Sequence, residues 1–242
     1  MRFLTLIKKF FRKHFFNPKW RCISCGKEIF DGSYFCPDCK ESLPLNDKSI
    51  CDHCGRELLV PQDYCSTCKG ELLSVDLARS VFTYRPPIST LIKKFKYGNK
   101  RYLAQAFCEY LSGLYLKCFL TADVITFVPM TKRSLKRRGY NQGELLAKGV
   151  SERVGVPCEN LLVKKSDTER RAKLDKNQRL KNLVDAFKVV DKKKVKNKTV
   201  LIIDDVSTTG ATGEAVGSKL KKAGAKKVIL LTIASVPPIN GY

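Results

Sequence analysis

Two adjacent carboxylates and a run of small hydroxyl residues form the segment with the clearest chemistry. An apolar stretch over residues 200–203 leads into Asp204 and Asp205, and a hydroxyl-rich turn follows. The apolar stretch predicts a buried strand, and backbone N–H groups and hydroxyls ahead of a helix make a cradle for phosphate. The two carboxylates can accept hydrogen bonds from vicinal sugar hydroxyls or order a Mg²⁺ shell. The predicted phosphate-binding residues are Ser207, Thr208, Thr209, Gly210, Ala211 and Thr212.

A capped strand–turn–helix without a ligand is the alternative for this segment. Neither G-x-x-x-x-G-K-[ST] nor G-x-G-x-x-G occurs in the chain, which disfavours a Walker A loop and ordinary dinucleotide binding.

A second anion site is expected after an earlier strand. Five cations fall within residues 132–138, a density suited to pyrophosphate. A solvated basic face would not need the Val-Pro break before the cations or the Gly-Tyr-Asn-Gln after them. The predicted ligand-binding residues here are Val128, Pro129, Arg133, Arg137, Arg138, Tyr140, Asn141 and Gln142.

Eight of the 11 cysteines form four C-x-x-C pairs near the N-terminus. The pairs make an internal repeat, since the two halves start 29 residues apart and Cys25-Gly26-Lys27-Glu28 matches Cys54-Gly55-Arg56-Glu57. Two structural Zn²⁺ sites are predicted, by sequential or cross-braced pairing, with a redox dithiol as the alternative. His53 is surplus to a four-cysteine shell and is expected in an exposed turn. The predicted ligands are Cys22, Cys25, Cys36, Cys39, Cys51, Cys54, Cys65 and Cys68.

Strands and helices alternate after residue 74, which predicts a mostly parallel sheet covered on both faces. In such sheets ligands bind beyond the carboxyl ends of the strands. Residues 167–182 are charged and are expected as a loop or a surface helix. The predicted strands are 81–84, 124–128, 199–203 and 227–234, and the predicted helices are 88–97, 101–119, 144–153 and 214–223.

The chain is strongly basic, with 46 Lys and Arg against 23 Asp and Glu, for a net charge of +23 over 242 residues. Such a charge attracts polyanions and disfavours a metabolic enzyme with a neutral substrate. The apolar N-terminal stretch is broken by cations, so it predicts neither a membrane span nor a secretory signal. Residues 2–16 instead predict a basic amphipathic helix, which either contacts a membrane surface or nucleic acid or docks on the protein. A cytoplasmic protein is expected, peripheral at the inner membrane face if that helix binds lipid.

The combination of Arg-Arg-Gly-Tyr-Asn-Gln over 137–142, Asp-Asp-Val-x-Thr-Thr-Gly-Ala-Thr over 204–212 and an N-terminal cysteine module resembles the ComF family. Lys96-Tyr97-Gly98 and residues 179–187 agree with it. The resemblance implies an α/β, type I phosphoribosyltransferase-like fold with flanking helices, preceded by a small zinc-ribbon module. Its expected parts are the helix over 1–18, the zinc module over 19–72 and the phosphoribosyltransferase-like domain over 73–242. Arg171 stands where the family pattern suggests Gln.

The resemblance further implies a pocket for 5-phosphoribosyl-1-pyrophosphate (PRPP) with Mg²⁺, and a role in handling single-stranded DNA during natural transformation beside a helicase. Asp204 and Asp205, the expected catalytic residues, would hold the ribose hydroxyls. The alternatives are a working phosphoribosyltransferase, for which no acceptor site is legible, and a scaffold with a vestigial pocket. Aromatic side chains among the cysteines could stack on bases or fill the ribbon core: Trp20, Phe30, Tyr34, Phe35 and Tyr64.

Overall fold

The computed structural model describes residues 20–71, 73–165 and 176–237. The predicted N-terminal helix and Arg171 lie outside the described residues. The chain divides into two compact units, Met1–Leu43 and Pro44–Tyr242. This division falls inside the cysteine-rich segment, so the second cysteine repeat shares a unit with the α/β elements.

The described part of the first unit is one cysteine ribbon. Arg21 and Glu28 form an isolated antiparallel bridge around the first C-x-x-C pair. The second pair flanks helix α2 (Pro37–Glu41), where Pro37 suits the first turn because it needs no N–H partner there. Tyr34 and Phe35 are buried in this ribbon, so they belong to its core and not to a stacking surface.

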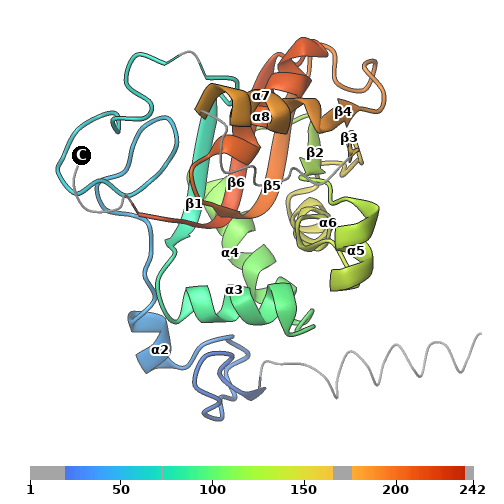
Figure 1. The fold of residues 1–242 in the computed structure, drawn as a ribbon. Helices are drawn as coiled ribbons and strands as arrows, with labels where there is room; N and C mark the ends of the chain where they lie inside the picture. Colours follow the sequence, from blue (N-terminus) through green and yellow to red (C-terminus); the bar gives the residue numbers. More distant parts are fainter. Residues whose placement is uncertain (1–19, 72, 166–175, 238–242) are drawn as a thin grey trace, which may run out of the picture. The chain divides into compact units, whose positions relative to one another are not determined.

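A four-stranded parallel sheet forms the centre of the second unit (Figure 1). Its order is β1-β6-β5-β2, and every pairing is parallel, which confirms the predicted sheet. The bounds are β1 (Leu77–Thr83), β2 (Val124–Phe127), β5 (Thr199–Ser207) and β6 (Lys227–Ser235). A separate antiparallel pair, β3 (Leu162–Lys164) with β4 (Phe187–Val189), was not predicted.

Helices cover both faces of this sheet, as expected. The buried side chains of Val200 and Ile202 pack with those of helix α8, so the alternate residues of β5 face the other way. Helices α4 and α6 contact the strands on that second face, and α7 packs on α8. The bounds are α3 (Ile88–Tyr97), α4 (Leu103–Lys117), α6 (Gln142–Val154), α7 (Lys176–Asp185) and α8 (Ala211–Lys222).

The basic segment after β2 folds as a helix, α5 (Lys132–Arg138), which was not predicted from the sequence. The Thr131 side chain caps it by accepting from the Ser134 N–H, and Gly139 ends it in the left-handed conformation with φ of 78°. Helical geometry spreads the cations around an axis instead of directing all of them to one side.

Across the described ranges, no helix combines the length and apolar character needed to cross a bilayer.

Candidate functional site

The paired carboxylates lie at the carboxyl end of β5, beside a pocket of about 180 Å³. This is the edge of a parallel sheet where ligands are expected, because strand ends and helix starts converge there. The lining residues are Lys96, Val128, Pro129, Met130, Thr131, Ser134, Arg138, Asn141, Gln142, Gly143, Lys164, Asp204 and Asp205.

Lys96, the penultimate residue of α3, supplies a countercharge to the carboxylates. Its Nζ lies 2.8 Å from Oδ1 of Asp205. Burial opposes the charge of Lys96, but the Asp205 carboxylate raises the pKa of Lys96 above its ordinary value. Burial and the neighbouring charge of Asp205 raise the pKa of Asp204 well above the usual range for a carboxyl group. The pocket therefore holds more negative charge than Lys96 neutralises, and a further cation or hydroxyl donors would be favoured.

The segment after α5 fixes α3, and with it Lys96, against the pocket. The Tyr140 hydroxyl donates to the Phe95 carbonyl, and Nε2 of Gln142 donates to the Lys96 carbonyl at 3.4 Å. Arg138 in turn donates to Oε1 of Gln142 at 3.3 Å. Tyr140 is buried. Its contacts are those of a residue that positions α3, whereas the sequence pattern predicted that it binds the ligand.

Asn141 joins the same segment to the end of β2. Its side chain caps α6 by accepting from the Glu144 N–H, and its Nδ2 donates to the Val128 carbonyl at 3.1 Å. The turn that carries Val128 and Pro129 is thereby tied to the start of α6.

The structure brings many of the predicted ligand-binding residues together. Val128, Pro129, Arg138, Asn141 and Gln142 line one pocket with the two aspartates. In contrast, Arg133 and Arg137 are exposed on α5 and are absent from that lining.

Lys96 and Lys164 line the pocket but were not predicted as site residues. Lys96 had a signal, because Lys96-Tyr97-Gly98 agrees with the family pattern. Lys164 had none, because it ends the short strand β3, which was not predicted either.

The predicted phosphate loop is an open turn between β5 and α8. Gly210 takes the left-handed conformation at the helix start, with φ of 81°, and Oγ1 of Thr209 accepts from the Ala211 N–H at 3.4 Å. Thr208 and Thr209 are exposed, while Ala211 and Thr212 are half-buried in the first turn of α8. The first N–H groups of a helix have no partner within it, so a helix start beside paired carboxylates is suited to a phosphorylated sugar.

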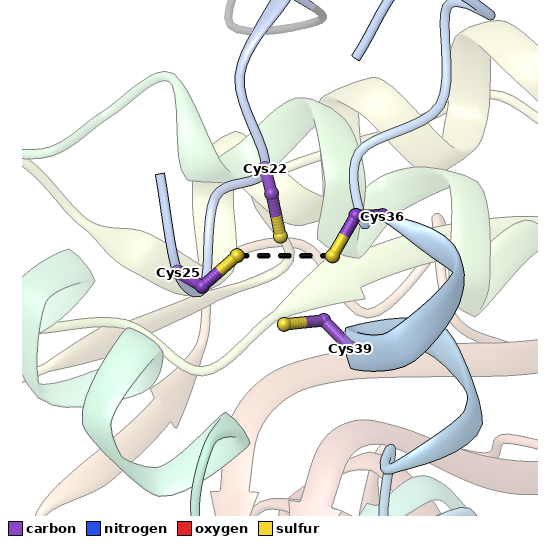
Figure 2. A group of neighbouring side chains, drawn as sticks. All are labelled: Cys22, Cys25, Cys36 and Cys39. Atoms are coloured by element: carbon purple, nitrogen blue, oxygen red, sulfur yellow. Dashed lines mark hydrogen bonds between the residues drawn. The ribbon is translucent and has the colours of Figure 1, made fainter. Parts of the chain in front are cut away.

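The eight paired cysteines form two separate clusters, one per repeat. Cys22, Cys25, Cys36 and Cys39 make the first and Cys51, Cys54, Cys65 and Cys68 the second, with the sulfurs of each within 4.8 Å of one another. The ligands are thus grouped sequentially. Figure 2 shows the four sulfurs of the first cluster directed towards a common centre.

The cluster geometry fits a tetrahedral metal ion. Ligands about 2.3 Å from a zinc ion lie about 3.8 Å apart. The Cys25 and Cys36 sulfurs are 3.7 Å apart, as are those of Cys54 and Cys65. All 11 cysteines are free thiols. The two four-cysteine clusters are consistent with two structural zinc ions.

Backbone N–H groups favour the thiolate that a metal requires. Burial raises the pKa of Cys22, but backbone N–H groups of Cys25, Cys36 and Ser24 oppose it, and the pKa falls to about 6. In the second cluster the pKa of Cys51 falls to about 7 for the same reason. His53 is half-buried, not exposed as predicted, and its backbone carbonyl accepts from the Ala78 N–H.

Comparisons with known proteins agree with this architecture. Residues 140–238 match the family model described as phosphoribosyl transferase domain, and residues 13–69 match the double zinc ribbon domain. Competence protein F of Haemophilus influenzae is 30% identical over 214 residues, covering 86% of this chain and 81% of that protein. DNA utilization protein YhgH of Escherichia coli is 30% identical over 155 residues, covering 62% and 67%. Competence protein ComFC of Streptococcus pneumoniae is 32% identical over 152 residues, covering 62% and 64%.

Fold, cysteine clusters and matched models define a protein with a phosphoribosyltransferase-like domain and an N-terminal double zinc ribbon. Within that class the chain belongs to the ComF competence protein family.

Proposed function

We propose that this protein binds PRPP and handles single-stranded DNA during natural transformation. The observation that carries the proposal is the carboxylate pair beside a cation-lined pocket, at the start of a helix whose first turn is open. Relatives named for competence and for DNA utilization support the cellular role.

The pocket residues divide the work of holding a phosphorylated sugar. Asp204 and Asp205 would accept hydrogen bonds from the two ribose hydroxyls, and the N–H groups at residues 207–212 would hold the 5′-phosphate. Lys96, Arg138 and Lys164 would neutralise the pyrophosphate. Mg²⁺, when bound with PRPP, would add a further positive charge at those oxygens.

The test is PRPP binding by isothermal titration calorimetry with Mg²⁺. The double variant Asp204→Asn/Asp205→Asn keeps the side-chain shapes and should weaken binding at least about 100-fold, because two charged acceptors are lost. Asp185→Asn/Asp191→Asn makes the same charge change outside the pocket lining and should bind as the wild type does. Unchanged affinity in the Asp204/Asp205 variant would refute the site assignment.

Exposed cations and aromatic side chains support binding of single-stranded DNA. Trp20 and Phe30 in the first ribbon are 66% and 84% exposed, and Tyr64 in the second is 48% exposed. Lys192, Lys193 and Lys196 are exposed around the buried anchor Val195. Aromatic faces stack on unpaired bases while cations neutralise phosphates.

Fluorescence anisotropy of a labelled single-stranded oligonucleotide at two salt concentrations tests this interface. Lys192→Gln/Lys193→Gln/Lys196→Gln should lower the salt dependence by up to about two phosphate contacts. Trp20→Ala/Phe30→Ala should weaken binding about 10-fold or more, whereas Phe119→Ala, which removes another exposed aromatic side chain, should not. No binding by the wild type at low salt would refute the DNA-handling role.

The intact carboxylate pair also favours a second candidate, a phosphoribosyltransferase that transfers ribose 5-phosphate to an unidentified acceptor. The pocket cations would then stabilise pyrophosphate as it leaves the anomeric carbon. Pyrophosphate release from PRPP with a panel of bases and amines distinguishes the two. Release with one acceptor supports the enzyme, and binding without turnover supports the handling protein.

Two further partners belong to this proposal. A helicase would act on the same DNA strand, and the basic N-terminal segment would hold the protein at the inner membrane face. Liposome flotation with anionic vesicles and a variant that lacks residues 1–18 tests the second of these.

A further inference from the structure

The second cysteine ribbon, which spans residues 51–68, contacts the predicted phosphate loop directly. Nη2 of Arg56 donates to the Thr208 carbonyl at 2.9 Å, across 152 positions of sequence. Arg56 follows the second C-x-x-C pair, and Thr208 is an exposed residue of the loop. His53, Arg56, Ser207, Thr209 and Gly210 also line one small cavity between ribbon and loop.

The turn that carries Arg56 is held from several sides. The Cys51 N–H donates to the Arg56 carbonyl and the Gly55 N–H to the Cys51 carbonyl, both at 2.9 Å, so the metal-ligand loop sets the turn. Nδ2 of the buried Asn46 donates to the Gly55 carbonyl at 2.7 Å. Gly55 has φ of 64°, and a Cβ there would lie 2.5 Å from the carbonyl oxygen of Ala78 in β1. The Arg56 backbone is therefore fixed against the sheet.

The segment just after the ribbon holds the other end of the loop. The Ser74 N–H donates to Oε2 of Glu214, in the first turn of α8, at 2.7 Å. Helix α8 also lies very close to this segment, because a Cβ on Gly217 would be 3.0 Å from Cγ2 of Val75. The ribbon and its continuation thus contact the loop before Gly210 and the helix after it.

A donor on the Thr208 carbonyl also orients the next backbone donor. The carbonyl of Thr208 and the N–H of Thr209 share one peptide plane and point in opposite directions. Fixing the carbonyl towards Arg56 therefore fixes the Thr209 N–H on the side away from that guanidinium. A phosphate cradle depends on N–H groups that are already oriented before the ligand arrives.

We propose that the second cysteine ribbon is a built part of the phosphate site, with Arg56 as a positioning residue for the loop over residues 207–212. The internal repeat provides a matched control, because Lys27 occupies the same position after the second cysteine of the first ribbon. The first ribbon belongs to the other compact unit.

Hydrogen exchange of the full-length protein without ligand tests the proposal by itself. Arg56→Gln should speed exchange of the amides over residues 207–212 by about 3–10-fold, because a charged donor to the loop backbone is lost. Arg56→Lys should restore part of the protection, and Lys27→Gln should leave it unchanged. The strand amides of β5 report global stability and should not change. Unaltered loop exchange in Arg56→Gln, or equal effects of Arg56→Gln and Lys27→Gln, would overturn the proposal.

The consequence for ligand binding rests on the proposed function. Mg²⁺-PRPP titrations should show Kd raised about 3–10-fold in Arg56→Gln and unchanged in Lys27→Gln. If the wild type binds no PRPP while Arg56→Gln still loosens the loop, the positioning role stands and the proposed ligand is wrong. If PRPP binds equally well to wild type and Arg56→Gln, Arg56 is not a positioning residue for the phosphate site.

Discussion

The two cysteine ribbons have matching sequences but different surroundings. In the first ribbon, a Cβ added at Gly26 meets nothing within 4 Å among the described residues, and Glu28 pairs with Arg21 of the same ribbon. In the second, Gly55 lies against the backbone of Ala78, and Glu57 pairs with Arg85 outside the ribbon.

The difference separates the role of the metal from the role of the ribbon. Four thiolates and a metal ion can fold either repeat, because the metal supplies the free energy that so small a core lacks. What the folded ribbon then does depends on the residues between and beside its ligands. In the second ribbon, Asn46, Arg56 and Glu57 connect it to β1 and to the phosphate loop.

Removal of one cluster at a time should give the largest contrast. Cys54→Ser/Cys65→Ser should lower the Tm of the α/β unit by about 5–10 °C, because the ribbon contacts on β1 and α8 are lost with the metal. Cys25→Ser/Cys36→Ser should change that transition by less than about 2 °C. Calorimetry measures both, and zinc analysis should find about one ion per chain in each variant.

Equal shifts in the two double variants would break the comparison. That outcome would mean that the stability of the α/β unit depends as much on the first cluster as on the second.

Alanine at the matched glycines should give the next largest difference. Both glycines have positive φ, 82° at Gly26 and 64° at Gly55, so each substitution costs about 1 kcal/mol of strain. Gly55→Ala adds the clash at 2.5 Å with the Ala78 carbonyl and should cost about 1–3 kcal/mol more. Urea unfolding of the zinc-loaded variants measures the difference. Equal costs would mean that the ribbon can move off β1 without loss.

The fold was predictable where a local pattern sufficed. The apolar runs over 124–128, 199–203 and 227–234 predicted β2, β5 and β6 because buried parallel strands need uninterrupted apolar residues. Lys132–Arg138 was not predicted to be helical, since its charges suggested a binding loop and its cap depends on a single threonine. Strands β3 and β4 have three residues each, too few for a period to be recognised.

The candidate site was predictable in part for the same reason. Asp204, Asp205 and the loop after them are contiguous, so one motif located them. Lys96 and Arg56 reach their partners across 109 and 152 positions, respectively. Such contacts follow from packing of α3 and of the second ribbon, which no local pattern specifies. The internal repeat even concealed the second case, because Arg56 and Lys27 looked equivalent.

Zinc release should sharpen the comparison kinetically. Cys25 of the first cluster is exposed and Cys39 is half-buried, whereas Cys54 is the least buried ligand of the second and is itself half-buried. A chelator must reach the metal–sulfur bonds, so the second cluster should lose zinc about 10-fold more slowly, the rate ratio of about 1.4 kcal/mol. A colorimetric chelator should record two phases of one ion each.

The single-cluster variants assign these phases. Cys54→Ser/Cys65→Ser should retain only the fast phase and Cys25→Ser/Cys36→Ser only the slow one. The reverse assignment would contradict the expected protection of the second cluster.

The smallest contrast should come from the glutamates that follow the matched glycine turns. Glu57 lies 3.1 Å from Arg85 with 18% of its side chain exposed, and it also accepts from Thr83 at 3.2 Å. Glu28 lies 3.2 Å from Arg21 with 63% exposed. Solvent screens the second pair more, so Glu57→Gln should cost about 0.5–1 kcal/mol and Glu28→Gln less than about 0.3 kcal/mol. A double-mutant cycle of Glu57→Gln with Arg85→Met isolates the pair, and zero coupling would mean that Glu57 contributes to docking through Thr83 alone.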